Sequence, residues 1–312
     1  MSRVAKFLLL IFSGVCLSAS AQVTYTGTTI ADAFLATGSP DNPVGSDLTG
    51  DNFGAAGTLA ISPASADKGA FQSVIRFNFS DAVTLFNSAY GANAWKITAI
   101  SLTLTSNYGT GGVQPNNKIF NVINGGQFVI EWLLNDDWVE GTGTPALPTS
   151  DGVTWNSLPD LLSGPHEILS TNTYAPPGNN VPVTYPLPLG TNLLANIVSG
   201  GDMSLLFYPA DNQIGYLFNS HEYGRGNDPL INVTAVPLLE IISGYFTNGV
   251  FHLTGVGGPG RPYQVQANSD LNQTNWLTLG TVMADTNGTI QFNDNSATNQ
   301  QRFYRLSGGI GE

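Results

Sequence analysis

The side chains best suited to acid–base or metal chemistry are three histidines, His166, His221 and His252, which are scattered along the chain. None has a partner histidine one helical turn away, the spacing of a helical zinc site. A hydrolase or lyase needs a paired acid and base, an activated nucleophile or a metal with an open position. The chain shows no nucleophile-elbow serine and no phosphate-binding glycine loop. The sequence therefore predicts a protein that is not an enzyme.

Carboxylates gather in one turn, where Asp136, Asp137 and Glu140 flank Trp138. They could form a catalytic pair, but acids in a surface turn are usually solvated. We therefore interpret them as solvated loop acids.

Aromatic side chains offer a second kind of chemistry, because a ring face can stack on the C–H face of a sugar. Trp138 is a candidate ligand-binding residue, although a tryptophan in a β-sandwich more often fills the core. Tyr108, Tyr174 and Tyr223 fall in segments rich in glycine, proline or asparagine. Such loops carry binding residues more often than cores do, so we expect these tyrosines to form exposed contact surfaces.

The amino-terminal segment reads as a secretory signal. Arg3 and Lys6 precede an apolar run over residues 7–17, and Ala19-Ser20-Ala21 offers small residues for cleavage before Gln22. The chain's one cysteine, Cys16, lies in this segment. It could be lipid-modified, but Val15 before it is not the small residue that a lipoprotein signal needs. We expect a secreted protein, extracellular or on the cell surface, with residues 1–21 removed and no membrane span.

The net charge of the chain limits the classes of binding partner that we expect. Removal of Arg3 and Lys6 leaves eight basic residues against 22 acidic ones, a net charge of −14. Nucleic acids and anionic membranes are bound through basic patches, so both are excluded as expected partners. A hydrophobic content of 42% is too high for a disordered chain.

Apolar and polar residues alternate with a period of two, and this pattern predicts the fold class. In residues 73–80, Ile75, Phe77 and Phe79 share one face, while Arg76 and Asn78 take the other. Residues 100–105, 118–123, 203–208 and 230–234 continue the pattern, with turn residues between them. Helices are expected only over residues 81–90 and 193–199. Alternation with frequent turns is typical of an all-β sandwich or barrel.

A second region begins after Val236-Pro237, because proline cannot continue a central strand. Six strands are expected between residues 240 and 306, with tight hairpins at Asn248-Gly249 and Asn287-Gly288. The length and strand number favour a small immunoglobulin-like or fibronectin-III-like sandwich. The predicted domains are thus residues 22–236 and 237–312.

The first region resembles the DNRLRE domain, a jelly-roll module related to family-96 carbohydrate-binding modules. The matching pieces are Ala31-Asp32-Ala33-Phe34, Asn52-Phe53-Gly54, residues 74–79 and 97–104, Trp138-Val139-Glu140-Gly141-Thr142-Gly143, Gly152-Val153-Thr154-Trp155-Asn156, Ser220-His221-Glu222 and Asp228-Pro229-Leu230. The resemblance implies a jelly-roll β-sandwich over residues 22–236. His221 stands where that pattern usually has an arginine.

The second region resembles the carboxy-terminal immunoglobulin-like module of secreted proteins of Verrucomicrobia-type bacteria. The likeness is carried by Tyr263-Gln264-Val265-Gln266, Asn275-Trp276 and Arg302-Phe303-Tyr304-Arg305. It implies a spacer or attachment domain.

A structural Ca²⁺ ion is the one cofactor expected, since jelly-roll binding modules often carry one and oxygen ligands are plentiful. Asp32, Asn52 and Glu222 are the candidate ligands, because the first and last strands of a jelly roll can lie together. The alternative is that they are polar loop residues bonded to their own backbone.

The leading hypothesis is a non-catalytic module that binds extracellular polysaccharide or adheres to a surface polymer. The alternative is a structural envelope, matrix or filament protein that self-assembles edge to edge. A polysaccharide-degrading enzyme is the weakest alternative. Exposed aromatics in a groove would favour the first, a long uncovered edge strand the second, and a cleft with converging carboxylates the third.

Overall fold

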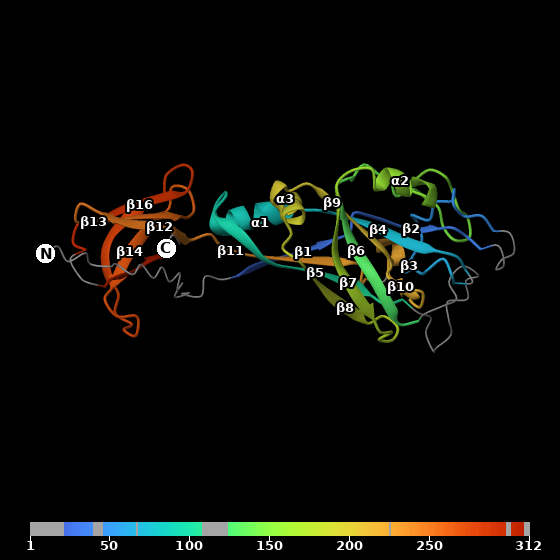
Figure 1. The fold of residues 1–312 in the computed structure, drawn as a ribbon. Coiled ribbons are helices and arrows are strands. Elements are labelled where there is room, and N and C mark those ends of the chain that lie inside the picture. Colours follow the sequence, from blue (N-terminus) through green and yellow to red (C-terminus); the bar gives the residue numbers. More distant parts are fainter. Residues whose placement is uncertain are drawn as a thin grey trace. The chain divides into compact units, whose positions relative to one another are not determined.

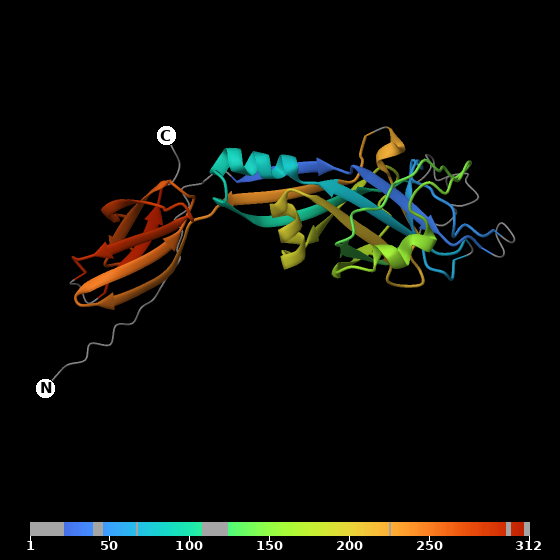
Figure 2. The ribbon, with the colours of Figure 1, turned by 90° about the horizontal axis from the view of Figure 1, so that it is seen from above.

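The computed structural model describes residues 22–39, 46–66, 68–107, 124–224, 226–297 and 301–308 (Figures 1 and 2). The chain divides into two compact units. The larger unit comprises Thr24–Val83 and Ile97–Thr234, and the smaller takes in Thr84–Lys96 and the chain from Ala235 onward. One boundary, before Ala235, lies next to the linker predicted at Val236-Pro237, but Thr84–Lys96, which the prediction assigned to the first domain, groups with the smaller unit. Within the described residues, no helix is long and apolar enough to span a membrane.

The protein is built of antiparallel strands, and the predicted all-β class is confirmed, with 47% of the described residues in strands and 12% in helices. The strands up to the linker are β1 (Val23–Thr28), β2 (Ala31–Ala36), β3 (Leu59–Ile61), β4 (Phe71–Asn78), β5 (Trp95–Thr105), β6 (Gly126–Leu133), β7 (His166–Tyr174), β8 (Pro182–Leu187), β9 (Asp202–Pro209), β10 (Tyr216–Phe218) and β11 (Leu230–Pro237). The helices are α1 (Ser80–Tyr90), α2 (Leu158–Leu161) and α3 (Thr191–Ser199), with 3₁₀ turns η2 (Trp155–Ser157) and η3 (His221–Tyr223). Both predicted helices therefore form, as α1 and α3. The strand expected over residues 118–123 lies outside the described residues.

Two sheets make the main sandwich, with strand orders β1-β11-β5-β8 and β2-β4-β9-β6-β7. The first strand, β1, lies beside the last, β11. If β4 is treated as an extra strand, the two orders become β1-β11-β5-β8 and β2-β9-β6-β7, which are those of a jelly roll. Aromatic residues fill the space between the sheets; Phe128 of β6, for example, meets Tyr185 of β8 edge to face at 5.2 Å.

Alternation in β4 and β5 places the core as expected. Ile75 and Phe77 are fully buried, whereas Arg76 and Asn78 are only partly covered. In β5, Leu102 and Leu104 are buried. The apolar residues that alternate along these strands thus form the interior of the sandwich.

The outer face of the five-stranded sheet has a second core beneath residues 134–165, the segment that carries α2. Ala31, Ala33 and Leu35 of β2 pack there with Trp138 and Leu161. Because side chains alternate along a strand, Asp32 and Phe34 point to the opposite face, toward the sandwich interior. This alternation directs a carboxylate into a buried site.

The smaller unit has two three-stranded sheets of orders β12-β13-β16 and β15-β14-β17. Their strands are β12 (Glu240–Thr247), β13 (Val250–Val256), β14 (Pro262–Asn268), β15 (Leu277–Met283), β16 (Thr289–Asp294) and β17 (Phe303–Ser307). Phe251, Leu253 and Val265 form the centre of its core. Asn248 and Gly249 both have positive φ, as the predicted tight hairpin requires.

Candidate functional site

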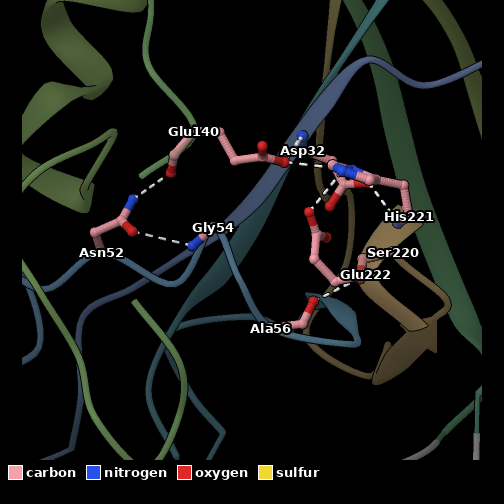
Figure 3. Close-up of polar contacts among 8 residues, drawn as sticks. All are labelled: Asp32, Asn52, Gly54, Ala56, Glu140, Ser220, His221 and Glu222. Atoms are coloured by element: carbon pink, nitrogen blue, oxygen red, sulfur yellow. Dashed lines mark hydrogen bonds and ion pairs between the residues drawn. The ribbon is translucent and has the colours of Figure 1, made fainter. Parts of the chain in front are cut away.

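Four ionisable side chains meet at the end of the larger sandwich that holds β2 and η3 (Figure 3). Asp32 comes from β2, Glu140 from the loop after β6, and His221 and Glu222 from η3. One potential metal-ligating atom from each residue lies within 4.8 Å of the others. We call these four residues the Asp32 cluster.

Backbone contacts fix the Asp32 cluster in place. The Asp32 N–H donates to Glu140 Oε1 at 2.7 Å, and the His221 N–H donates to Asp32 Oδ2 at 2.9 Å. Ser220, the residue just before η3, donates its hydroxyl to the Ala56 carbonyl (Figure 3). Segments nearly 190 residues apart are thus joined through one carboxylate.

The His221 ring lies among three carboxylates. Its Nδ1 atom is 3.4 Å from Asp32 Oδ2 and 3.3 Å from Glu140 Oε1. Its Nε2 atom is 2.7 Å from Glu222 Oε1. The ring thus faces two carboxylates with Nδ1 and a third with Nε2.

Burial and mutual repulsion change the acidity of the Asp32 cluster. Burial raises the pKa of Asp32 to about 6 and that of Glu140 to about 7. Hydrogen bonds to Asp32 and Glu222 raise the pKa of His221 to about 10. Burial also raises the pKa of Glu222, but the interactions with His221 outweigh it and the net shift is downward. The Asp32 cluster therefore favours a positive charge at its centre.

Two carboxylate oxygens of the Asp32 cluster are buried without a hydrogen-bond partner among the described residues, Asp32 Oδ1 and Glu222 Oε2. Asp32 has no exposed surface at all. A buried ionised oxygen without a donor is costly, so these oxygens indicate capacity for a further cation or proton.

The structure brings together two of the three predicted metal ligands, Asp32 and Glu222, but not Asn52. The Asn52 amide donates to the carbonyls of Glu140 at 2.6 Å and Val153 at 2.9 Å, and its oxygen accepts from the N–H groups of Gly54 and Gly143. Both ends of the amide are therefore occupied by backbone groups, and Asn52 braces loops instead of ligating an ion. Whether Ca²⁺ binds the Asp32 cluster stays a prediction.

Sequence reasoning missed two members of the Asp32 cluster. Glu140 was expected to be a solvated loop acid. This is wrong, because its carboxylate accepts the backbone N–H of Asp32 in the buried strand β2, and its side chain is only 24% exposed. His221 was set aside for lack of a nearby histidine, but its partners come from other segments. The only available signal for both was their place in the DNRLRE-like motifs.

The predicted aromatic contact surface is mostly absent from the described residues. Tyr174 ends β7, is 1% exposed and stacks on Tyr216 with ring centroids 3.7 Å apart, so its placement in an exposed loop is wrong. Trp138 is 7% exposed, lies beneath the Arg76 guanidinium at 4.8 Å and donates its indole N–H to Ser204. It belongs to the core.

Tyr223 is half-buried in η3, next to the Asp32 cluster. Tyr108 lies outside the described residues.

A separate open pocket of about 420 Å³ lies over α2 and the loop after β6. Its apolar lining comes from Val139, Val153, Leu161 and Trp138. Its polar lining comes from Asn135, Asp137, Ser150, Asp151, Ser157 and Asp160. The pocket combines an apolar surface with several hydrogen-bonding groups, the composition of a small-ligand site.

Comparison with models of protein families finds no match to this chain, and comparison with curated proteins finds none either. The resemblances to the DNRLRE domain and to the Verrucomicrobia-type module therefore stay predictions.

Proposed function

We propose that the chain is a secreted binding protein without catalytic turnover, whose larger unit binds an extracellular polysaccharide in the open pocket over α2. One observation carries this proposal: the pocket is lined both by apolar side chains, of which Val139 is exposed, and by hydroxyl, amide and carboxylate groups. Secretion rests on the signal-like residues 1–21.

The pocket suits a sugar because a sugar has both apolar and polar faces. Val139 is 62% exposed and offers an apolar contact for C–H groups. The exposed carboxylates of Asp137 and Asp160 accept hydrogen bonds, and vicinal sugar hydroxyls donate them. A volume of about 420 Å³ is within the range of small-ligand pockets.

The negative charge of the pocket determines which charge types of sugar we expect to bind. Asp137, Asp151 and Asp160 line it, and no lysine or arginine does. Hydrogen bonds from Thr149 and Thr142 lower the pKa of Asp151 to about 2, so that side chain stays ionised. Like charges repel, so we expect neutral or amino sugars to bind and uronic acids or sulfated sugars to be rejected.

The absence of turnover is supported by where the proton-exchanging groups lie. A glycosidase needs a carboxylic acid of raised pKa beside the bound sugar. Asp32 and Glu140 have raised pKa values, yet neither lines the pocket. Incubation with polysaccharides should therefore release no new reducing ends or unsaturated products.

The binding experiment uses two exposed aliphatic residues of the same loop. Val139 lines the pocket, whereas Leu147, which is 77% exposed, does not. Val139→Asp should place a charge against the sugar and weaken binding of glycan-array hits about tenfold, roughly 1.4 kcal/mol. Leu147→Asp should leave binding unchanged. Equal effects of the two variants, or no retention by any glycan, would refute the pocket as the binding site.

Self-assembly is a second candidate function, because β12 is an edge strand with little covering. Ile242 and Tyr245 are each 57% exposed and Phe246 is 42% exposed. Apolar edge strands pair readily with other chains. If β12 mediates assembly, Tyr245→Lys should abolish concentration-dependent association in analytical ultracentrifugation. A monomer at all concentrations would count against this alternative.

A further inference from the structure

We propose that Asp32, Glu140 and His221 bind a divalent transition-metal ion, for which Zn²⁺ is the best candidate, while Glu222 holds the imidazole in the ligating orientation. This site is separate from the polysaccharide pocket, and none of these residues lines that pocket. The inference therefore does not depend on the proposed function.

The first argument is the spacing of the three ligating atoms. His221 Nδ1 lies 3.4 Å from Asp32 Oδ2 and 3.3 Å from Glu140 Oε1. A charge-assisted hydrogen bond is usually about 2.7–2.9 Å long, so both distances are long for one. Ligands at about 2.0–2.1 Å from a tetrahedral metal are roughly 3.3–3.4 Å from each other. The observed separations are those of two edges of a zinc tetrahedron.

The second argument is the orientation of the ring. Glu222 Oε1 lies 2.7 Å from His221 Nε2, a distance at which Nε2–H donates to the carboxylate. In the neutral ring, the lone pair is then on Nδ1 and faces Asp32 and Glu140. Metal-ligating histidines commonly donate their other N–H to a carboxylate in this way, which fixes the tautomer and the ring plane.

The third argument is the charge of the Asp32 cluster and its unpartnered oxygen. Three carboxylates meet one imidazole, and no lysine or arginine of the described chain forms an ion pair with any of them. When all three carboxylates are ionised, even a protonated ring leaves two negative charges uncompensated. Asp32 Oδ1 has no hydrogen-bond partner among the described residues, and Asp32 is fully buried. A divalent ion would neutralise these charges and give the buried carboxylate a partner.

The chemical types of the ligand atoms favour Zn²⁺ over Ca²⁺. Ca²⁺ takes six to eight oxygen ligands, whereas Asp32, Glu140 and His221 together supply one ring nitrogen and at most four carboxylate oxygens. Imidazole with carboxylates suits Zn²⁺ and its neighbours, and among common ions Zn²⁺ binds such sites more tightly than Mn²⁺ or Fe²⁺. Three protein ligands leave a fourth position for water or a ligand group.

The experiment measures Zn²⁺ binding to the full chain, purified without a histidine tag and stripped with a chelator. Isothermal titration should show one Zn²⁺ per chain. At a hundredfold excess over the Kd, Zn²⁺ should raise the unfolding midpoint by about 5–10 °C. Equal concentrations of Ca²⁺ should produce a smaller shift.

Substitutions of each histidine assign the site. His221→Arg should abolish Zn²⁺ binding yet keep the fold, because a guanidinium replaces the positive charge without a metal-ligating lone pair. Glu222→Gln should weaken binding about 10–100-fold. His166→Gln and His252→Gln are matched controls; His166 also contacts a carboxylate, Glu131, at 2.6 Å, and both variants should bind Zn²⁺ normally.

Several results would overturn the proposal. These are no Zn²⁺ binding by the stripped protein, binding that survives His221→Arg, loss of binding in a control variant, or tighter binding of Ca²⁺ than of Zn²⁺. His221→Arg carries the test on its own if removal of Asp32 prevents folding.

Discussion

Replacement of Tyr174 by alanine should destabilise the larger unit strongly, because this side chain is part of its interior. Tyr174 is 1% exposed, and its ring lies parallel to that of Tyr216 within 14°. Truncation of a buried large aromatic residue to alanine costs about 3–5 kcal/mol, and a lost aromatic pair accounts for roughly 0.5–1.5 kcal/mol. We expect a loss of about 4 kcal/mol. For a unit of this size, that corresponds to a fall of about 8–16 °C in the unfolding midpoint.

The measurement is urea unfolding followed by tryptophan fluorescence, with Tyr174→Phe as the control. The phenylalanine variant keeps the stacked ring and should lose no more than about 1.5 kcal/mol. Suppose instead that Tyr174→Ala unfolds within 1 kcal/mol of the unaltered protein and loses only its retention by polysaccharide. The side chain would then be an exposed contact residue, and the packing argument would be refuted.

Three further predictions test the core, the smaller unit and export. Trp138→Phe should cost about 1–3 kcal/mol, since the buried Ser204 hydroxyl loses the indole N–H that donates to it; a double-mutant cycle with Ser204→Ala should show the coupling. Burial raises the pKa of Asp294, but hydrogen bonds from Ser296 and other groups outweigh it and the net shift is downward. The stability from Asp294 should therefore be present above pH of about 4 and lost as the pH falls through its lower folded pKa, so Asp294→Asn should remove this acid dependence from unfolding curves measured between pH 2 and 6. Amino-terminal sequencing of exported protein should begin at Gln22, and a start at Met1 would contradict the signal assignment.

The fold class could be predicted from sequence because alternation is a local signal. Ile75 and Phe77 lie two residues apart, and no tertiary information is needed to assign them to one face. The convergence of Asp32 and Glu222 was also predictable, since it requires only that early and late strands of a jelly roll be neighbours.

Tyr174 shows where the local signal failed. Ser170 of β7 pairs with Ile130, but Ile168 pairs with Glu131, so Leu169 is an extra residue in the ladder. Such a bulge changes the parity of alternation along the strand. The proline-rich and glycine-rich stretch directly after Tyr174 then favoured a loop, although the strand continues to Tyr174.

Glu140 and His221 could not be assigned from spacing, because their partners are distant in the sequence. Glu140 lies 108 residues from Asp32 and His221 lies 189. No periodicity links positions so far apart. Their proximity comes from sheet order and from the path of the long loop after β6, which composition does not encode.

The pairing of β1 with β11 brings the first and last strands of the larger unit side by side. The Thr24 and Thr234 hydroxyls are 3.0 Å apart, and the Thr26 hydroxyl donates to Asn232 two residues further along each strand. A module with adjacent ends can be inserted into a host loop, or circularly permuted by a short link between its ends, without disturbing its strands. A segment that starts before β1 and ends after β11 would therefore present its two ends close together for joining to another scaffold.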